Sequence, residues 1–201
     1  MTRREKQAQT RAGLIDAAAK VFARRGYHAA SVEEIAAEAG FSTGAVYSNF
    51  SGKEELFLAL ADRKIAERVA DTRALAEVAE RGESPGEEAA EQFRAFMGRD
   101  PDWPVLFYEF WSYGVRSERI QDEFAQRRLA LRDALAETLE QVAKALGFEL
   151  RFPAPVLATA VSAALNGLAF ERAADPGGLP DEVLTEFIAA VLACSVAAPG
   201  E

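Results

Sequence analysis

A short polar stretch, residues 42–50, holds the side chains that are best suited to contact another molecule. Val46 and Phe50 lie four residues apart and would face inward from a helix of about two turns, which leaves the other positions exposed. Hydroxyls, a carboxamide, a methyl group and a glycine backbone suit the hydrogen-bonding edges and thymine methyls of a DNA major groove. We therefore expect these residues to read bases: Ser42, Thr43, Gly44, Ala45, Ser48 and Asn49.

The same stretch contains no arginine, the side chain that most often makes bidentate contacts to guanine. One such helix would discriminate weakly between DNA sequences. Two copies on a twofold dimer would multiply the discrimination and would require an inverted-repeat operator. We expect Tyr47 and Lys53 to contact phosphates and to position the protein without reading sequence, since Lys53 adjoins the N-terminus of the next helix.

Residues 31–50 are predicted to form two short helices joined by a glycine turn. Ser31 and Glu34 have the spacing of a capping box, and Gly40 stands where a left-handed turn residue is needed. An amphipathic helix over residues 10–25 precedes them. The three helices together predict a helix-turn-helix, in which the last helix enters the major groove.

Three consecutive stretches resemble the tetracycline-repressor (TetR) family of bacterial regulators. They are TRAGLIDAAAKVFARRGY at residues 10–27, SVEEIAAEAGFSTGAVYSNF at 31–50 and SGKEELFLAL at 51–60, which span roughly the first 60 of 201 residues. The resemblance implies a regulator that binds double-stranded operator DNA, most often a repressor of a neighbouring transporter or enzyme gene that a small ligand releases.

The family's docking mode implies further DNA contacts. The start of the first helix, at Thr10 and Arg11, would lie near a phosphate, and Ser31 joins the candidate DNA-binding residues at the start of the next helix. Many members carry a lysine where this chain has Thr43, so no charged contact is expected there.

Positive charge is concentrated near these helices. Residues 1–53 hold 8 Lys and Arg against 5 Asp and Glu, the rest of the chain holds 15 against 27, and the overall net charge is −9. Contact with phosphates favours a positive end, and the acidic remainder would be repelled by DNA; chance asymmetry is the alternative. A basic arm of Arg3, Arg4 and Lys6 is either disordered or touches phosphates or the minor groove.

Several other classes of protein fit the composition poorly. No apolar run reaches the roughly 18 residues that span a membrane, and the polar N-terminus is unlike a signal peptide. A single cysteine, Cys194, cannot form an internal disulfide, which suits the cytoplasm. His28 is the only histidine and has no cysteine or carboxylate cluster beside it, so we expect neither a metal nor a cofactor.

The remainder of the chain is predicted to be helical, because alanine is abundant and β-branched runs are scarce. A second capping box at Ser51 and Glu54 would open a helix of roughly 40 Å that ends at about Glu80. We expect an all-α fold: an N-terminal three-helix helix-turn-helix DNA-binding domain, residues 1–53, joined by this long helix to a C-terminal helical ligand-binding and dimerisation domain, residues 54–201.

The second domain contains an aromatic stretch, residues 101–113, in which 6 of 13 residues are aromatic. Such a face forms either ordinary core or the wall of an apolar ligand cavity, which a ligand-controlled regulator needs. Glu109 would favour a cation, and Asn166 would either reach the ligand or bridge two helices. The candidate ligand-binding residues are Phe93, Phe96, Trp103, Phe107, Glu109, Phe110, Trp111, Tyr113 and Asn166.

Two apolar helices rich in small residues are expected at residues 154–174 and 180–196. The second has two apolar faces, which is more than the core of one monomer needs, so we expect a four-helix interface between two copies of the chain. The alternative is a helix buried within the monomer. The candidate interface residues are Ala160, Ala164, Leu184, Phe187, Ile188 and Val191.

Two rival functions are weighed against a regulator. An enzyme is disfavoured because no glycine-rich phosphate loop, metal constellation or nucleophile–base set occurs, and Glu109 alone does not make a mechanism. A ligand-binding or partner-binding protein with a vestigial helix-turn-helix would lack salt-dependent DNA binding. In the regulator, a ligand that tilts the helix over residues 53–80 would change the spacing of two reading helices and weaken binding by about 1–3 kcal/mol.

Overall fold

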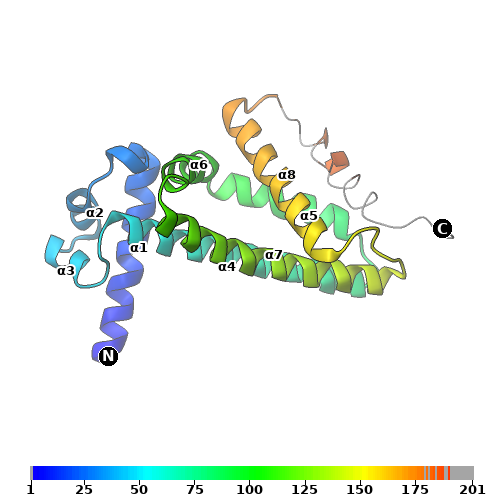
Figure 1. The fold of residues 1–201 in the computed structure, drawn as a ribbon, viewed down its shortest axis with the longest axis horizontal. Helices are drawn as coiled ribbons and strands as arrows, with labels where there is room; N and C mark the ends of the chain where they lie inside the picture. Colours follow the sequence, from blue (N-terminus) through cyan, green and yellow to red (C-terminus); the bar gives the residue numbers. More distant parts are fainter. Residues whose placement is uncertain (1, 179, 181, 184, 188–189, 191–201) are drawn as a thin grey trace. The chain divides into compact units, whose positions relative to one another are not determined.

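The computed structural model describes residues 2–178, 180, 182–183, 185–187 and 190, without the side chains of residues 96 and 97 (Figure 1). Along these residues the helices are α1 (Arg3–Ala29), α2 (Val32–Ala39), α3 (Thr43–Tyr47), α4 (Lys53–Glu80), α5 (Pro85–Arg99), α6 (Trp103–Gly114), α7 (Glu118–Leu146) and α8 (Ala154–Ala174). The described part of the chain contains no strand. The predicted all-α fold with an N-terminal helix-turn-helix is confirmed.

The chain folds into two compact units, each of which combines separate stretches of sequence. The first contains Met1–Ile65 and Leu106–Arg116, and the second contains Ala66–Val105 and Ser117–Glu201. Helices α4 and α6 therefore contribute residues to both units. The sequence predicts two domains that follow one another along the chain and are divided after Lys53. This division stays a prediction.

The core of the first unit is formed by large side chains from α1, α2, α3, α4 and α6 and by Phe50, which follows α3. Burying each of them contributes about 1.5–3 kcal/mol. The buried residues that set this core are Leu14, Val21, Phe22, Ile35, Val46, Phe50, Leu56, Phe57, Leu60 and Phe110. Val46 and Phe50 face inward, as the sequence predicts for the helix that carries them.

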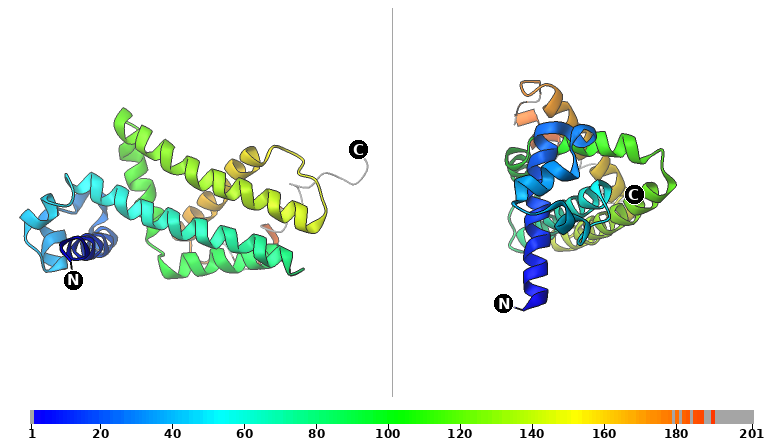
Figure 2. Two further views of the ribbon diagram at one scale, coloured as in Figure 1. Left: turned by 90° about the horizontal axis from the view of Figure 1, so that it is seen from below. Right: turned by 90° about the vertical axis from the view of Figure 1, so that its left-hand side faces the viewer.

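Helix α1 is longer than the sequence predicts. It begins at Arg3, where the Thr2 hydroxyl accepts the Glu5 N–H and the Glu5 carboxylate accepts the Thr2 N–H. This capping box satisfies backbone donors that would otherwise be unpaired. The basic arm is therefore helical, and its first turns project beyond α2 and α3 (Figure 2, right).

The two capping boxes expected further along the chain differ in outcome. The box of Ser31 and Glu34 forms at the start of α2, and Gly40 ends that helix with a φ of 70°. At the start of α4, however, the Ser51 N–H donates to Glu55 at 2.7 Å rather than to Glu54. Glu54 instead accepts a hydrogen bond from the Tyr113 hydroxyl at 2.6 Å. A hydrogen bond between residues 59 positions apart thus takes the place of the expected bond to Ser51.

The second unit is held by helix packing, in which α7 and α8 make the most extensive contact. Between these two helices lies a buried cluster of Ala136, Leu139, Ala154, Leu157 and Ala158. The small side chains of α8 allow α7 to approach closely. A second cluster joins α5 to the C-terminal half of α8 through Ala90, Phe93 and Ala169, with Trp103 packed against it.

Candidate functional site

Helix α3 presents a mixed polar face. The Ser42 hydroxyl accepts the Ala45 N–H at 3.2 Å and so caps the helix. Val46 is fully buried, whereas the neighbouring Tyr47 is 56% exposed. Thr43 and Ala45 are half-buried and Gly44 is exposed. A five-residue helix is thus anchored by one valine while the side chains before and after it remain accessible.

Two residues expected to read bases bond within their own helix. The Asn49 amide donates to the Ala45 carbonyl at 2.8 Å and to the Ser48 hydroxyl, and that hydroxyl donates to the same carbonyl at 2.9 Å. Ser48 is exposed, but Asn49 is half-buried and its Oδ1 is buried without a hydrogen-bond partner among the described residues. The expected outward orientation of Asn49 is not found, because its side chain folds back to the Ala45 carbonyl of α3.

Arg11 fastens the end of α3 to α1. Its guanidinium donates to the Asn49 carbonyl at 3.2 Å and lies 4.2 Å from the centre of the Phe50 ring. Thr10 is half-buried, and its hydroxyl donates to the Lys6 carbonyl within α1. Arg11 therefore has a structural role in holding the end of α3. The family's docking mode implied only a phosphate contact for this residue.

Lys53 is directed toward the fold rather than toward solvent. Its Nζ donates to the carbonyls of His28 at 3.0 Å and Ala30 at 2.9 Å, and it lies 4.7 Å from the centre of the Tyr27 ring. These carbonyls end α1, where a cation is favoured by the unpaired acceptors and the helix dipole. Burial lowers the pKa of Lys53, and the charge of Glu109 opposes that shift. Lys53 thus caps the C-terminus of α1, and its expected phosphate contact stays a prediction.

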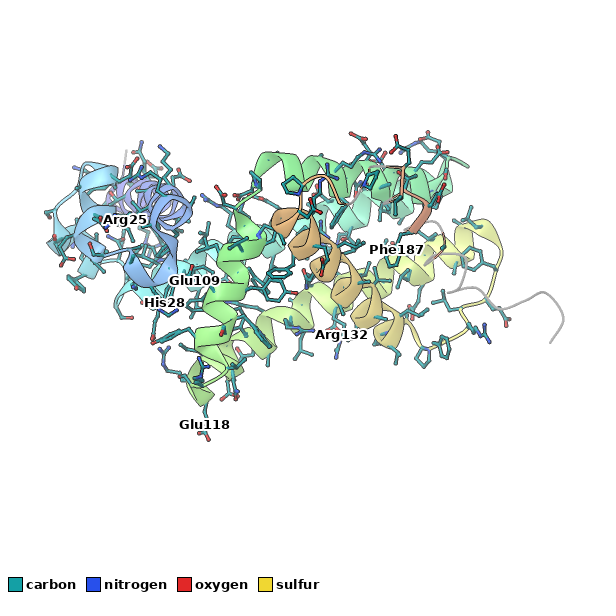
Figure 3. The ribbon with its side chains drawn as sticks, turned by 90° about the horizontal axis from the view of Figure 1, so that it is seen from above. Arg25, His28, Glu109, Glu118, Arg132 and Phe187 are labelled. Atoms are coloured by element: carbon teal, nitrogen blue, oxygen red, sulfur yellow. The ribbon has the colours of Figure 1, made fainter. Side chains whose placement is uncertain are left out.

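Glu109, on α6, binds the backbone of α1. Its carboxylate accepts the N–H groups of Tyr27 at 2.9 Å and His28 at 3.2 Å. Figure 3 shows Glu109 beside His28. These donors are exposed by a break at Gly26, whose φ of 74° interrupts the helix. A Cβ on Gly26 would lie 2.9 Å from a Glu109 oxygen, so glycine provides both the backbone conformation and the space for the carboxylate.

The aromatic residues that follow on α6 also join the first unit. The Phe110 ring stacks on Phe57 at 3.9 Å and meets Tyr27 edge-on at 4.6 Å. Tyr113 lies 5.5 Å from Tyr27, and Trp111 is 40% exposed. Phe107 is half-buried within the same segment of α6. Phe110 and Tyr113 therefore pack within the first unit, whereas Trp103 packs against the cluster of Phe93 in the second. The ligand contacts expected of this stretch stay a prediction.

The second unit encloses a cavity of about 100 Å³. Its wall is built by α4, α5, α7 and α8 and is mainly apolar. Of the residues expected to bind a ligand, Phe93 lines it; the side chain of Phe96 lies outside the described residues, and Asn166 is exposed on α8. Sequence reasoning missed the charged lining residues Arg68 and Asp71. Their spacing of three on an amphipathic helix was the available signal.

The residues expected at a dimer interface do not share one environment in the structure. Ala160 is exposed on α8, whereas Ala164 and Phe187 line the cavity. Leu184, Ile188 and Val191 lie outside the described residues. Helix α8 also exposes Val156 and Phe170, and it is the one described helix long and apolar enough to cross a membrane, with 22% of that window buried. The core helix of a soluble protein meets the same criterion.

Comparisons with known proteins identify both parts of the sequence. Residues 14–60 match a family that is described as "Bacterial regulatory proteins, tetR family". Residues 87–195 match a second family, described as "BetI-type transcriptional repressor, C-terminal". The repressor AcnR of Corynebacterium diphtheriae is 30% identical over 156 residues, which cover 77% of this chain and 76% of AcnR. The chain belongs to the TetR family of transcriptional regulators.

Another sequence relative and two solved structures also resemble this TetR regulator. The activator FasR of Mycolicibacterium smegmatis is 36% identical over 101 residues, which span 50% of this chain and 46% of FasR. Among solved structures, a TetR regulator from Haloarcula marismortui superposes with a TM-score of 0.76 at 16% identity and covers 94% of this chain and 100% of that one. FadR from Bacillus subtilis, in complex with stearoyl-CoA, gives 0.67 at 18% identity and covers 92% and 97%. These likenesses establish the fold.

A metal centre finds no support in the described part of this TetR regulator, since no three His, Cys, Asp or Glu residues group there in a way that could hold an ion. The exposed Ser42, Tyr47 and Ser48 surround α3, and a polar face of this kind suits DNA, which TetR-family regulators bind.

Proposed function

We propose that this regulator is a cytoplasmic repressor that binds an inverted-repeat operator as a homodimer and leaves it when a small effector binds. The exposed face of α3 carries the proposal, because Tyr47 is 56% exposed directly beside the buried anchor Val46. A face of this composition suits a DNA major groove. The name of AcnR as a repressor supports the direction of control.

The DNA contacts are proposed residue by residue. Thr43, Gly44 and Ala45 contact base edges, since they are at least partly accessible at the start of α3. Tyr47 contacts a phosphate and sets the position of the helix. Ser42, Ser48 and Asn49 hold α3 in shape, because each bonds the backbone of that helix. Residues 1–53 are proposed as the DNA-binding domain and residues 54–201 as the domain that binds effector and partner.

Homodimerisation is proposed through α8. Val156, Ala160, Ala163 and Phe170 are exposed and follow one another at intervals of four, three and seven, so they share one face of the helix. Small and apolar side chains on one face allow two helices to pack closely around a twofold axis. The second apolar helix that the sequence places after residue 180 lies partly outside the described residues.

The effector is proposed to bind in the cavity of the second unit. Its mainly apolar wall with a few polar groups is typical of small-molecule sites. FadR from Bacillus subtilis, a regulator of the same fold, was crystallised with stearoyl-CoA. Effector binding would favour a form of the dimer in which the two α3 helices no longer match successive major grooves.

Activation is the second candidate, because FasR is named an activator. The same α3 contacts serve both modes of control. A reporter gene behind the chain's own upstream region separates them. Deleting the regulator should raise expression of a repressed gene and lower that of an activated one.

Gel-shift titration with the chain's upstream DNA at two salt concentrations tests the proposal. A regulator that contacts several phosphates loses affinity steeply as salt rises. Thr43→Val, which removes the hydroxyl and keeps the shape, should change operator preference. Binding that is weak, independent of salt and unaffected by Thr43→Val would refute the proposal.

A further inference from the structure

Gly44, in α3, is a glycine that the fold itself does not require. Its φ is not positive, unlike that of Gly40, which ends α2. A Cβ added to Gly44 would meet the Ser42 Oγ at 3.8 Å, which is an ordinary van der Waals contact. Alanine would therefore fit at this position. It would also favour the short helix, because glycine is the less favourable of the two residues within a helix.

Gly44 lies on the side of α3 that is turned away from the core. Successive residues of an α-helix are about 100° apart, so Gly44 lies about 200° around the helix from Val46. Val46 is fully buried and Gly44 is exposed, so the missing side chain leaves backbone accessible on the outer face. A glycine in such a place allows another molecule to approach the backbone closely. For a TetR regulator that molecule is DNA.

The outer face of α3 is poorly supplied with bidentate hydrogen bonds for bases. Arginine, lysine, glutamine and asparagine make such bonds, and residues 42–50 contain none of the first three. The one asparagine, Asn49, donates to the Ala45 carbonyl and to the Ser48 hydroxyl. The Ser48 hydroxyl in turn donates to the Ala45 carbonyl. Recognition by this helix therefore needs contacts of another kind.

Ala45, which follows Gly44, offers a methyl group. Its side chain has no polar atom, so apolar contact is the only direct readout it can make. Thymine is the base that carries a methyl group in the major groove. Ala45 is half-buried, so its methyl group reaches a base only if the neighbouring backbone comes close as well. The absent side chain of Gly44 allows that approach.

We propose that each half-site of the operator contains a thymine whose methyl group packs against the methyl group of Ala45, and that Gly44 permits the close approach that this contact needs. The inference rests on the proposed function, because it names the base that α3 recognises. Burial of one methyl group corresponds to about fourfold in affinity for one half-site, and to tenfold or more for two.

Deoxyuridine tests the contact, because it lacks only the methyl group of thymine and pairs in the same way. The operator is first selected by the full chain from a random library of duplexes. Each thymine position of the half-sites is then replaced by deoxyuridine in turn. At one position the replacement should weaken binding by wild type about tenfold, as fluorescence anisotropy measures.

Ala45→Gly completes a cycle between protein and DNA. The same replacement should have no further effect on this variant, because the methyl group that thymine contacts is already absent. Ala37→Gly, at an exposed alanine of α2, is the matched control for a weakened helix. It should keep the full deoxyuridine effect.

Gly44→Ala should separate stability from binding. The variant should have a higher midpoint of chemical denaturation than wild type, because alanine fits the backbone of α3. Its affinity for the operator should fall at least about tenfold, because the added methyl group holds α3 away from the bases. Gly98→Ala is the matched control, at an exposed glycine of α5 whose added Cβ would meet nothing within 4 Å. It should bind as wild type does.

Half-sites without a common thymine, or an affinity that no deoxyuridine replacement changes, would overturn the proposal. So would a deoxyuridine effect that persists in Ala45→Gly shown to be folded by circular dichroism, or a Gly44→Ala variant that binds as tightly as wild type. If Ala45→Gly does not fold, Gly44→Ala takes its place in the cycle and should lose the deoxyuridine effect. A chain that selects no duplex refutes the repressor itself, whereas one whose selected duplex tolerates deoxyuridine refutes this inference alone.

Discussion

At the scale of single residues, two opposite charges hold the last turns of α1. Lys53 donates to the carbonyls of His28 and Ala30, and Glu109 accepts the N–H groups of Tyr27 and His28. The break at Gly26 exposes the donors, and the end of the helix exposes the acceptors. Each charge therefore satisfies backbone groups that the helix itself cannot pair.

Lys53→Met should lower stability rather than specifically weaken the contact with DNA. It keeps an unbranched apolar chain but removes two hydrogen bonds, which should cost about 1–2 kcal/mol. Chemical denaturation measures this cost. Lys20→Met, at an exposed lysine of α1, is the control and should be nearly neutral.

The salt dependence of DNA binding distinguishes a Lys53 that caps α1 from a Lys53 that contacts a phosphate. The slope of log affinity against log salt should be unchanged in Lys53→Met. A slope reduced by about one, with unaltered stability, would instead assign this lysine to a phosphate.

Glu55 should make stability depend on pH in the acid range. The Ser51 N–H, as the main cause, lowers the pKa of this carboxyl, and the charge of Arg11 contributes. Because the folded pKa lies below the unfolded value of about 4.3, the stabilisation is complete above that pH and is lost as the pH falls through the folded pKa. The site is partly solvated, so about 0.5 kcal/mol is expected.

Denaturation of Glu55→Gln from pH 7 to pH 3 measures this effect. The difference from wild type should shrink as the pH falls, whereas Glu140→Gln, at an exposed position of α7, should show little difference at either pH. A difference for Glu55→Gln that is constant over this range would exclude the ionised hydrogen bond.

At the scale of elements, the helical arm at the start of α1 extends the positive surface of the first unit. Arg4 and Arg11 are seven residues apart and share a face of α1, and Arg11 uses that face to reach the end of α3. The exposed Arg3, Arg4 and Lys6 are therefore on a rigid extension. A helix fixes the position of these charges, which a disordered arm does not.

Replacing Arg3, Arg4 and Lys6 together by Gln should reduce the salt slope of DNA binding by about two to three and weaken operator and random DNA alike. Gel shifts on both kinds of DNA measure this. Thr2→Ala is the companion variant, since it removes the cap and keeps every charge. If the triple variant keeps the wild-type slope, the arm does not touch phosphates.

At the scale of the whole molecule, the proposed repressor would gain specificity by pairing two chains. A single α3 offers few base contacts, so the affinity for an operator would come from two such helices on one dimer. The net negative charge of residues 54–201 favours the same arrangement, because DNA attracts the positive residues 1–53 and repels the rest.

Ala163→Glu should produce monomers, because it places a charge in the middle of the exposed face of α8. Sedimentation measures the oligomeric state. Affinity for the full operator should fall by about 100-fold or more, while affinity for a half-site should be unchanged. Leu129→Glu, at an exposed leucine of α7, is the control. A dimer that persists in Ala163→Glu would place the interface on another surface.

The local features of this protein could be predicted without coordinates. Helical periodicity, the capping box of Ser31 and Glu34, and the glycine turn at Gly40 depend on residues only a few positions apart, so the helix-turn-helix could be predicted. The inward positions of Val46 and Phe50 followed from the same periodicity.

The partners of side chains that reach across the fold could not be predicted from the sequence. An apolar face on α6 shows that residues such as Phe110 are buried, but periodicity does not tell which core receives them. Lys53, Glu54 and Glu109 find partners 23 to 82 residues away in the chain. Such pairings depend on the packing of whole helices, as does the cavity beside Arg68, and helix packing is not written in any short stretch of sequence.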